Sequence, residues 1–134
     1  MALDLLLVFL PLMGSIVAGI IVFIPVVDDK KKANLNKLAQ WATCIAMVIS
    51  ATCSIFVFND VALNGNARTT EIFTWIDSGA LEVSWALKVD TLTAVMMIVV
   101  TVVSAMVHIY SVGYMHHDSS VPRFMSYLSL FTFF

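Results

Sequence analysis

Long apolar runs dominate the hydrophobic pattern of this chain. Three of them, 5–27, 38–58 and 91–112, contain no Lys, Arg, Asp or Glu. About 20 helical residues cross the ~30 Å hydrocarbon layer of a bilayer, so each run predicts a membrane-spanning helix. A fourth run, 124–134, covers about half of that layer. We therefore expect an incomplete fourth helix over 121–134, in a chain that is the front part of a larger protein.

A different periodicity occupies the long segment between the second and third runs. In 81–89 apolar residues alternate with polar or small ones, which is typical of a half-buried strand. The apolar segment 71–76 precedes it, and Asp77-Ser78-Gly79 supplies turn residues. This predicts a β-hairpin over about 71–89. The fold expected is an all-α integral membrane protein with three complete transmembrane helices, a truncated fourth and a β-hairpin in the long outer loop.

Charge fixes the expected orientation. The short segment 28–37 carries four lysines, and Lys/Arg-rich loops stay on the cytoplasmic or matrix side. The N-terminus and the hairpin are then outside, with Trp75 and Trp85 suited to the membrane surface. The third helix returns the chain to the inside, where Arg123 is expected to anchor at the interface, facing headgroups or a neighbouring acid.

Composition narrows the class of protein. Hydrophobic residues make up 60% of the chain and charged residues 12%, which excludes an ordinary soluble domain. A net charge of −2 without a basic stripe gives no support for nucleic-acid binding. Asp4 stands where a cleavable signal peptide would be basic. Cys44 and Cys53 point to opposite sides of one helix, so we expect small apolar residues rather than a disulfide or metal site.

Small residues at four-residue spacing predict where helices pack closely. They occur in the first two runs as Gly14/Ala18, Ser15/Gly19 and Ala42, Ala46, Ser50 and Ser54. In the third run a small, polar stripe should face protein while the valine-rich side faces lipid; its members are Ala94, Thr101, Ala105 and His108. Pro11 predicts a kink in the first helix.

Few residues could carry chemistry. Within the complete membrane runs, His108 is the one side chain of a type that changes charge near neutral pH, which makes it a candidate for proton movement or for coupling to a partner. A structural role, bonding a carbonyl or reaching headgroups, is the alternative. Asp90 and Asp118 each precede an expected helix, and a carboxylate there caps unpaired N–H groups. The helix-four cap would include Ser119 and Ser120.

The sequence offers no catalytic, cofactor-binding or metal-binding motif. His116-His117-Asp118 resembles a metal cluster, but adjacent residues rarely converge on one ion and no further Cys or His completes a set. No nucleophile–base pair, glycine-rich phosphate loop, haem motif or iron–sulfur spacing is present. We therefore expect no catalytic site in this chain by itself.

Several stretches closely resemble one family. They are Val-Asp-Thr-Leu-Thr-Ala-Val-Met-Met at 89–97, Val-His-Ile-Tyr-Ser-Val-Gly-Tyr-Met at 107–115 and Pro-Arg-Phe-Met-Ser-Tyr-Leu-Ser-Leu-Phe-Thr-Phe-Phe at 122–134. Phe-Leu-Pro-Leu-Met-Gly at 9–14 and Phe-Thr-Trp-Ile at 73–76 agree. Together they resemble the N-terminal region of the antiporter-like subunit of respiratory complex I, which is subunit L in bacteria and subunit 5 in mitochondria. The alphaproteobacterial and mitochondrial branch is the most similar.

The resemblance implies a membrane-arm subunit of an NADH:quinone oxidoreductase, a translocase that couples proton translocation to electron transfer in the respiratory chain. It implies other membrane-arm subunits and the lipid bilayer as partners. NADH, FMN, the iron–sulfur clusters and ubiquinone or another quinone would bind other subunits. The location would be the bacterial inner (plasma) membrane or the mitochondrial inner membrane. The family's principal pumping Glu and Lys have no counterpart in 1–134, so the chain alone should not pump.

Two other functions fit the same pattern. The large subunit of a multisubunit cation/proton antiporter shares the ancestral membrane fold but lacks redox chemistry. A small structural membrane protein, acting in assembly or packing, would need only the three helices and the hairpin. Against it, a half-buried fourth helix would place a terminal carboxylate in hydrocarbon, which is unfavourable.

Overall fold

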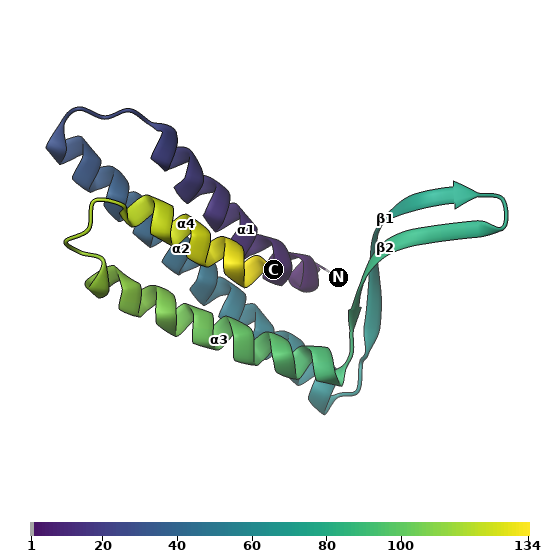
Figure 1. The fold of residues 1–134 in the computed structure, drawn as a ribbon. Coiled ribbons are helices and arrows are strands. Elements are labelled where there is room, and N and C mark those ends of the chain that lie inside the picture. Colours follow the sequence, from purple (N-terminus) through teal and green to yellow (C-terminus); the bar gives the residue numbers. More distant parts are fainter. Residues whose placement is uncertain (1) are drawn as a thin grey trace.

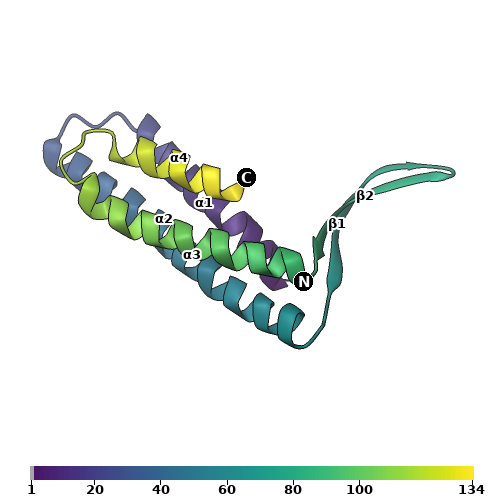
Figure 2. The ribbon, with the colours of Figure 1, turned by 60° about the horizontal axis from the view of Figure 1, so that its bottom comes forward.

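The computed structural model describes residues 2–134 as a bundle of four helices with a hairpin that projects from one end (Figure 1). Figure 2 shows the same bundle tilted, with the hairpin clear of the helices. The elements in chain order are α1 (Ala2–Phe23), α2 (Asp29–Phe58), a π-helical turn η1 (Asn59–Leu63), β1 (Arg68–Ser78), β2 (Leu81–Val89), α3 (Thr91–Tyr114) and α4 (Val121–Phe133).

The three long helices are confirmed, with two corrected boundaries. Residues 2–23, 29–63 and 91–114 form helices long and apolar enough to cross a membrane. The first helix ends at Phe23 rather than 27, because Pro25 disfavours helical geometry in the residue before it. The second begins at Asp29 rather than 38, so the lysine-rich segment is helical. Lysine and alanine are good helix formers, and Asp29 in the first turn complements the helix dipole.

The predicted hairpin is confirmed, and residues 2–134 themselves bury only its base, so burial of one face against a membrane surface stays a prediction. β1 and β2 pair antiparallel from Arg68 opposite Val89 to Ser78 opposite Leu81, with two register shifts. Gly79 in the turn has φ +61°, a conformation that favours glycine. Only Thr70 and Val89, at the base, are buried. Alternation marks two unlike faces, but among residues 2–134 no helix packs on either face beyond the base.

An aromatic cluster occupies one part of the hairpin. The ring centroids of Phe73 and Trp85 lie 5.8 Å apart, and those of Trp75 and Trp85 lie 6.4 Å apart, both in stacked geometry. All three rings remain about half exposed or more. Their seating at a membrane surface stays a prediction.

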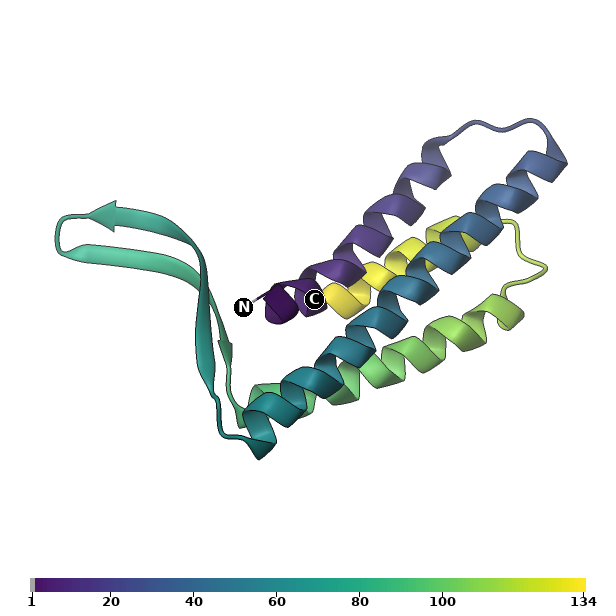
Figure 3. The same ribbon diagram turned by 180° about the vertical axis from the view of Figure 1, so that it is seen from behind.

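The connections gather at two opposite ends of the bundle. Figure 3 shows the start of α1, the hairpin and the start of α3 at one end, and the α1–α2 and α3–α4 connections at the other. This arrangement is the one that the charge-based orientation requires. The side of the membrane that each end faces remains a prediction.

Close helix packing occurs where the small residues predicted it. A Cβ added at Gly14 would lie 3.2 Å from Ser129 Oγ of α4 and 3.3 Å from Ala46 Cβ of α2. The Ser15 hydroxyl donates to the Ser126 carbonyl (3.0 Å), and the Ser126 hydroxyl donates to the Ser15 carbonyl (2.9 Å). Reciprocal hydroxyl–carbonyl bonds therefore join α1 and α4 where small residues let the helices approach closely.

Pro11 is accommodated inside α1 by a hydroxyl from α2. Proline has no N–H, so it cannot bond the carbonyl of Leu7 four residues earlier. The Ser50 hydroxyl donates to that carbonyl at 2.9 Å. In hydrocarbon an unpaired carbonyl is unfavourable, and Ser50 removes that penalty while helix α1 continues through Pro11 to Phe23.

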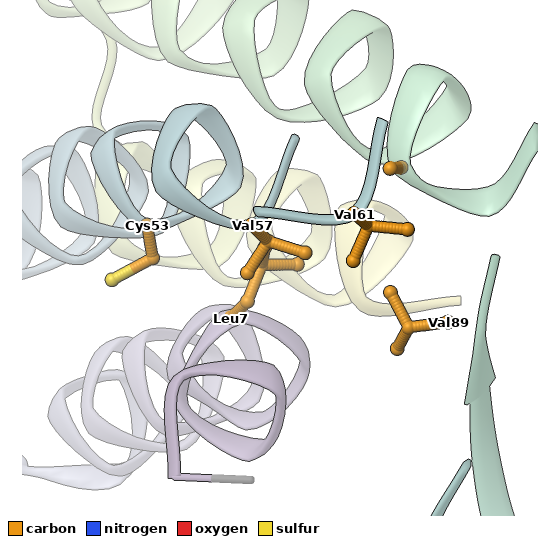
Figure 4. Close-up of a cluster of buried hydrophobic side chains, with 6 residues drawn as sticks. Leu7, Cys53, Val57, Val61 and Val89 are labelled. Carbon is orange, nitrogen blue, oxygen red and sulfur yellow. The ribbon is translucent and has the colours of Figure 1, made fainter. Parts of the chain in front are cut away.

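A hydrophobic cluster joins the hairpin to the bundle (Figure 4). The cluster combines side chains of α1, α2, η1 and the start of α3 with Val89 at the end of β2. The buried members are Leu7, Cys53, Val57, Val61, Val89 and Ala94. Burial of Cys53 here agrees with its expected role as a small apolar residue.

Candidate functional site

One face of α3 forms a buried, partly polar line through the middle of the bundle. Its buried residues are Ala94, Thr101, Ala105, His108 and Ser111, which include every member of the predicted stripe. On the other faces the residues expected to meet lipid are exposed: Val95, Val99, Val102, Val103 and Met106. The structure thus places His108 against protein rather than lipid.

His108 is fully buried, with 0% of its surface exposed. Its Nδ1 lies 2.7 Å from the carbonyl oxygen of Ser104, one turn earlier on α3. A carbonyl oxygen can only accept, so Nδ1 carries the hydrogen. In the neutral imidazole Nε2 is then the acceptor. Nε2 is the one buried side-chain N or O atom of residues 2–134 without a hydrogen-bond partner.

Hydroxyl groups flank His108 along the same face of α3. The Thr101 hydroxyl donates to Ser54 Oγ of α2 at 2.8 Å. The hydroxyls of Ser104 and Thr132 of α4 lie 2.9 Å apart. Thr101, Ser104 and Thr132 also line a cavity of about 660 Å³ between α1, α3 and α4, which is otherwise mostly apolar. The line therefore carries hydrogen-bonded hydroxyl groups within the helix bundle, together with the imidazole of His108.

A charged cluster, absent from the sequence predictions, lies at the hairpin end. Asp4 is fully buried. Arg68 at the base of β1 donates to it twice, from Nε to Oδ2 and from Nη2 to Oδ1, each at 2.8 Å. Arg68 also pairs with Asp60 of η1, which accepts from the Asn66 amide at 2.9 Å. The cluster ties α1, η1 and the hairpin together.

Electrostatics keep the arginine of this cluster charged. The bidentate contact with Asp4 raises the pKa of Arg68 above its ordinary value. The signal in the sequence was an acid in the first turn of an apolar run and a lone arginine in the loop expected on the same side. Their pairing depends on the packing of the hairpin base against α1, which periodicity does not report.

Asp90 occupies the N-cap of α3. Its carboxylate accepts from the Thr93 backbone N–H at 2.9 Å and from the Thr93 hydroxyl at 2.8 Å. These bonds hold the pKa of Asp90 below its usual range, the backbone bond most strongly. The carboxylate therefore stabilises the first turn of α3 in its ionised form.

Replacing Asp90 with Ala should loosen the first turn of α3. Amide exchange at Thr93 and Ala94 should become faster at neutral pH, because the Thr93 N–H loses its acceptor. In the unchanged chain this protection should fall with acidification. A carboxyl with a lowered folded pKa stabilises above its unfolded value of about 3.9, and this contribution is lost as the pH falls through the lower folded pKa.

The control for this prediction is Asp118→Ala, which removes a carboxylate at the opposite end of α3. Hydrogen exchange followed by mass spectrometry should show no change at Thr93 in that variant. Equal exchange at Thr93 in the Asp90 variant and the unchanged chain would contradict the capping role.

The remaining candidates lie at the other end of the bundle. Ser120 is the N-cap of α4 and makes no side-chain cap bond. Asp118 instead accepts from the Ser120 N–H at 2.7 Å, so it closes the turn before the helix rather than capping it. Arg123 is exposed. The rings of His116 and His117 contact edge to face, with centroids 5.0 Å apart.

The structure thus does not bring the predicted residues into one site. Asp90 precedes α3 at the hairpin end, and His108 lies within α3. Asp118 and Arg123 lie beside and at the start of α4, at the opposite end. Within residues 2–134 no three His, Cys, Asp or Glu side chains lie close enough to hold a metal ion. His108 is the one candidate with an unexplained buried atom.

Comparison with known proteins relates the sequence of this chain to one family. Residues 75–125 match the family described as NADH-ubiquinone oxidoreductase (complex I), chain 5 N-terminus. The chain is 42% identical over 127 residues to NADH-quinone oxidoreductase subunit L of Rickettsia conorii, covering 95% of this chain and 18% of that protein. It is 41% identical over 126 residues to NADH-ubiquinone oxidoreductase chain 5 of Neurospora crassa, covering 94% and 16%.

A plant relative agrees. Chain 5 of Arabidopsis thaliana is 44% identical over 130 residues, covering 97% of this chain and 18% of that protein. The chain thus spans about a fifth of the length of the curated relatives it matches, while nearly all of its own residues align. The resemblance in the α3 and α4 segments is confirmed: the chain belongs to the family of complex I chain 5 and NADH-quinone oxidoreductase subunit L.

Proposed function

We propose that this chain is a membrane-arm part of a proton-translocating NADH:quinone oxidoreductase. The observation that carries the proposal is a sequence alignment. Nearly the whole chain aligns with relatives named for that enzyme, and about two in five of the aligned residues are identical. Three helices able to cross a membrane support it. The names of these relatives favour this function over a cation/proton antiporter or a separate assembly protein.

The chain's contribution would be a packed helical frame rather than a redox site. We propose that NADH, FMN, iron–sulfur clusters and quinone bind other subunits, and that other membrane-arm subunits and lipid surround these helices. The bacterial plasma membrane or the mitochondrial inner membrane is the proposed location. Relatives of both kinds support that choice.

Within this frame we assign His108 to proton coupling. Two features support the assignment: complete burial in a membrane-spanning helix and an Nε2 atom without a partner. A buried polar atom is normally paired, so Nε2 calls for a water or a polar group outside residues 2–134. With Nδ1 held by the Ser104 carbonyl, protonation of Nε2 turns an acceptor into a donor at one fixed position.

Replacing His108 with Asn in the complete subunit, assembled in its complex, tests the assignment. Asn keeps a short amide that can donate to the Ser104 carbonyl but cannot titrate. NADH oxidation with an artificial acceptor should be unchanged. Protons moved per electron should fall in reconstituted vesicles, because the titrating group is gone. The readouts are acceptor reduction and acidification of the vesicle lumen in the same preparation.

Val103→Ala, on the lipid-facing side of α3, is the matched control and should leave both readouts unchanged. A His108→Asn complex that pumps normally would return His108 to a structural role while leaving the family function intact. If the subunit assembled normally into a complex that does not oxidise NADH, that result would instead overturn the proposed function.

A further inference from the structure

A small pocket lies at the end of the bundle opposite the hairpin. It has a volume of about 180 Å³ and is formed by the end of α1, the first turns of α2 and the start of α4. Figure 1 shows these segments meeting beside the α1–α2 and α3–α4 connections. None of the residues that line it belongs to the line on α3 or to the Arg68 cluster.

Two cationic side chains from different helices line this pocket. They are Lys32 of α2 and Arg123 of α4. Among residues 2–134 the ion pairs join Lys31 to Asp28, and Arg68 to Asp4 and Asp60, so neither lining cation is neutralised. Of the three nearby acids, Asp28 pairs with Lys31 at 3.3 Å and Asp118 accepts from the Ser120 N–H. Asp29, in the first turn of α2, forms no ion pair with Lys32 or Arg123 within residues 2–134.

Hydrogen-bond donors and branched apolar side chains complete the lining of the pocket. Asn36, Ser119 and Ser120 contribute an amide and two hydroxyls that can donate hydrogen bonds. Ile24 and Val26, beside the end of α1, line the same pocket with branched apolar side chains. Charge, donors and hydrocarbon in one small pocket at the end of membrane-spanning helices match the junction of a lipid headgroup and its acyl chains.

We propose that this pocket binds the phosphate of an anionic phospholipid. Lys32 and Arg123 supply the charge, the hydroxyls of Ser119 and Ser120 donate to phosphate oxygens, and Ile24 and Val26 contact the first acyl carbons. A basic pocket between membrane helices is a known basis of anionic-lipid recognition. The apolar wall favours a lipid over a soluble phosphate, whose surroundings would be entirely polar. The site is independent of the function assigned to His108.

The test uses the 134-residue chain in bilayer nanodiscs. Spin-labelled phosphatidylglycerol and phosphatidylcholine report, by the fraction of immobilised label, the relative affinity of the protein for each lipid. The unchanged chain should prefer phosphatidylglycerol. Lys32→Gln with Arg123→Gln should lower that preference about fivefold or more, since a basic residue near the surface contributes about a factor of five.

Matched variants separate the pocket from general surface charge. Lys30→Gln with Lys37→Gln also removes two positive charges, but both lysines lie on α2 outside the pocket lining. This variant should keep most of the preference for phosphatidylglycerol. Lys32→Arg with Arg123→Lys should also keep it. Circular dichroism checks the helix content, and Lys32→Gln alone, at an exposed position, serves if the double variant does not fold. An equal loss in both double variants would overturn the proposal.

Inorganic phosphate provides the second arm. Added at the same ionic strength as a chloride buffer, it should not displace labelled phosphatidylglycerol more than chloride does. If phosphate displaced the labelled phosphatidylglycerol from the unchanged chain but not from the Lys32/Arg123 variant, the pocket would be a site for a soluble anion. That result would overturn the proposal of a lipid site.

Discussion

Replacing Arg68 with Met should destabilise the chain more than any other single surface-charge change. Removing one partner of a buried ion pair typically lowers the free energy of unfolding by about 3–5 kcal/mol. We expect about 3 kcal/mol here, because the Arg68 side chain is 26% exposed and Asp4 is fully buried. The hairpin base and the start of α1 should loosen together. Denaturation in micelles, followed by tryptophan fluorescence, measures the loss.

Lys88→Met is the matched control. It removes a positive charge from the same hairpin, where Lys88 is exposed and faces Thr69 across the strands. Its effect should be within about 0.5 kcal/mol. Asp4→Asn added to Arg68→Met should recover part of the loss, because the buried group is then neutral. Equal destabilisation by the Arg68 and Lys88 variants would show that the Asp4 contact contributes nothing.

Replacing Gly14 with Val should force α1 away from both of its neighbours. An added Cβ alone would approach Ser129 Oγ to 3.2 Å and Ala46 Cβ to 3.3 Å, and valine brings two further methyl groups. Overpacking of this kind typically lowers the free energy of unfolding by about 1–3 kcal/mol. The same denaturation experiment measures it, and crosslinking between cysteines placed on α1 and α4 reports the separation.

Gly113→Val controls for the change in residue type. A Cβ at Gly113, near the end of α3, meets nothing within 4 Å. Both variants carry the same change in intrinsic helix propensity, so the difference between them isolates packing. If Gly14→Val were as stable as Gly113→Val, α1 would not be held at the close approach described above.

Hydrophobic pattern alone predicted the parts of this fold that depend on one element at a time. Four of the five buried residues of α3 were predicted, all but Ser111, because a helical period fixes which side chains share a face. Asp90 before Thr91 was recognisable as a cap for the same local reason. The hairpin was recognisable from alternation and a turn.

The rest depends on contacts between elements. Alternation in 81–89 distinguishes two faces but does not reveal whether anything covers either one, and no described part of the chain covers them beyond the base. Ser50 was identified as a small residue, but its bond to the Leu7 carbonyl requires that α2 pass beside Pro11. The Arg68–Asp4 pair joins residues 64 apart. The lysine-rich segment 28–37 was predicted to be a loop because of its charge, but lysine and alanine are good helix formers and α2 begins at Asp29.

The hydroxyl contacts between α1 and α4 set an order of assembly during synthesis. Ser15 and Ser126 are separated by 111 residues, and Ser129 bonds Pro11 across 118 residues. At about 5–20 residues per second, the ribosome delivers α4 roughly 6–24 s after α1. Until then α1 can pack only on α2, with its Ser15 face turned to lipid or to the insertion machinery. Among the four described helices, α1 is therefore made earliest but must wait for α4 before it has the neighbours that this structure shows.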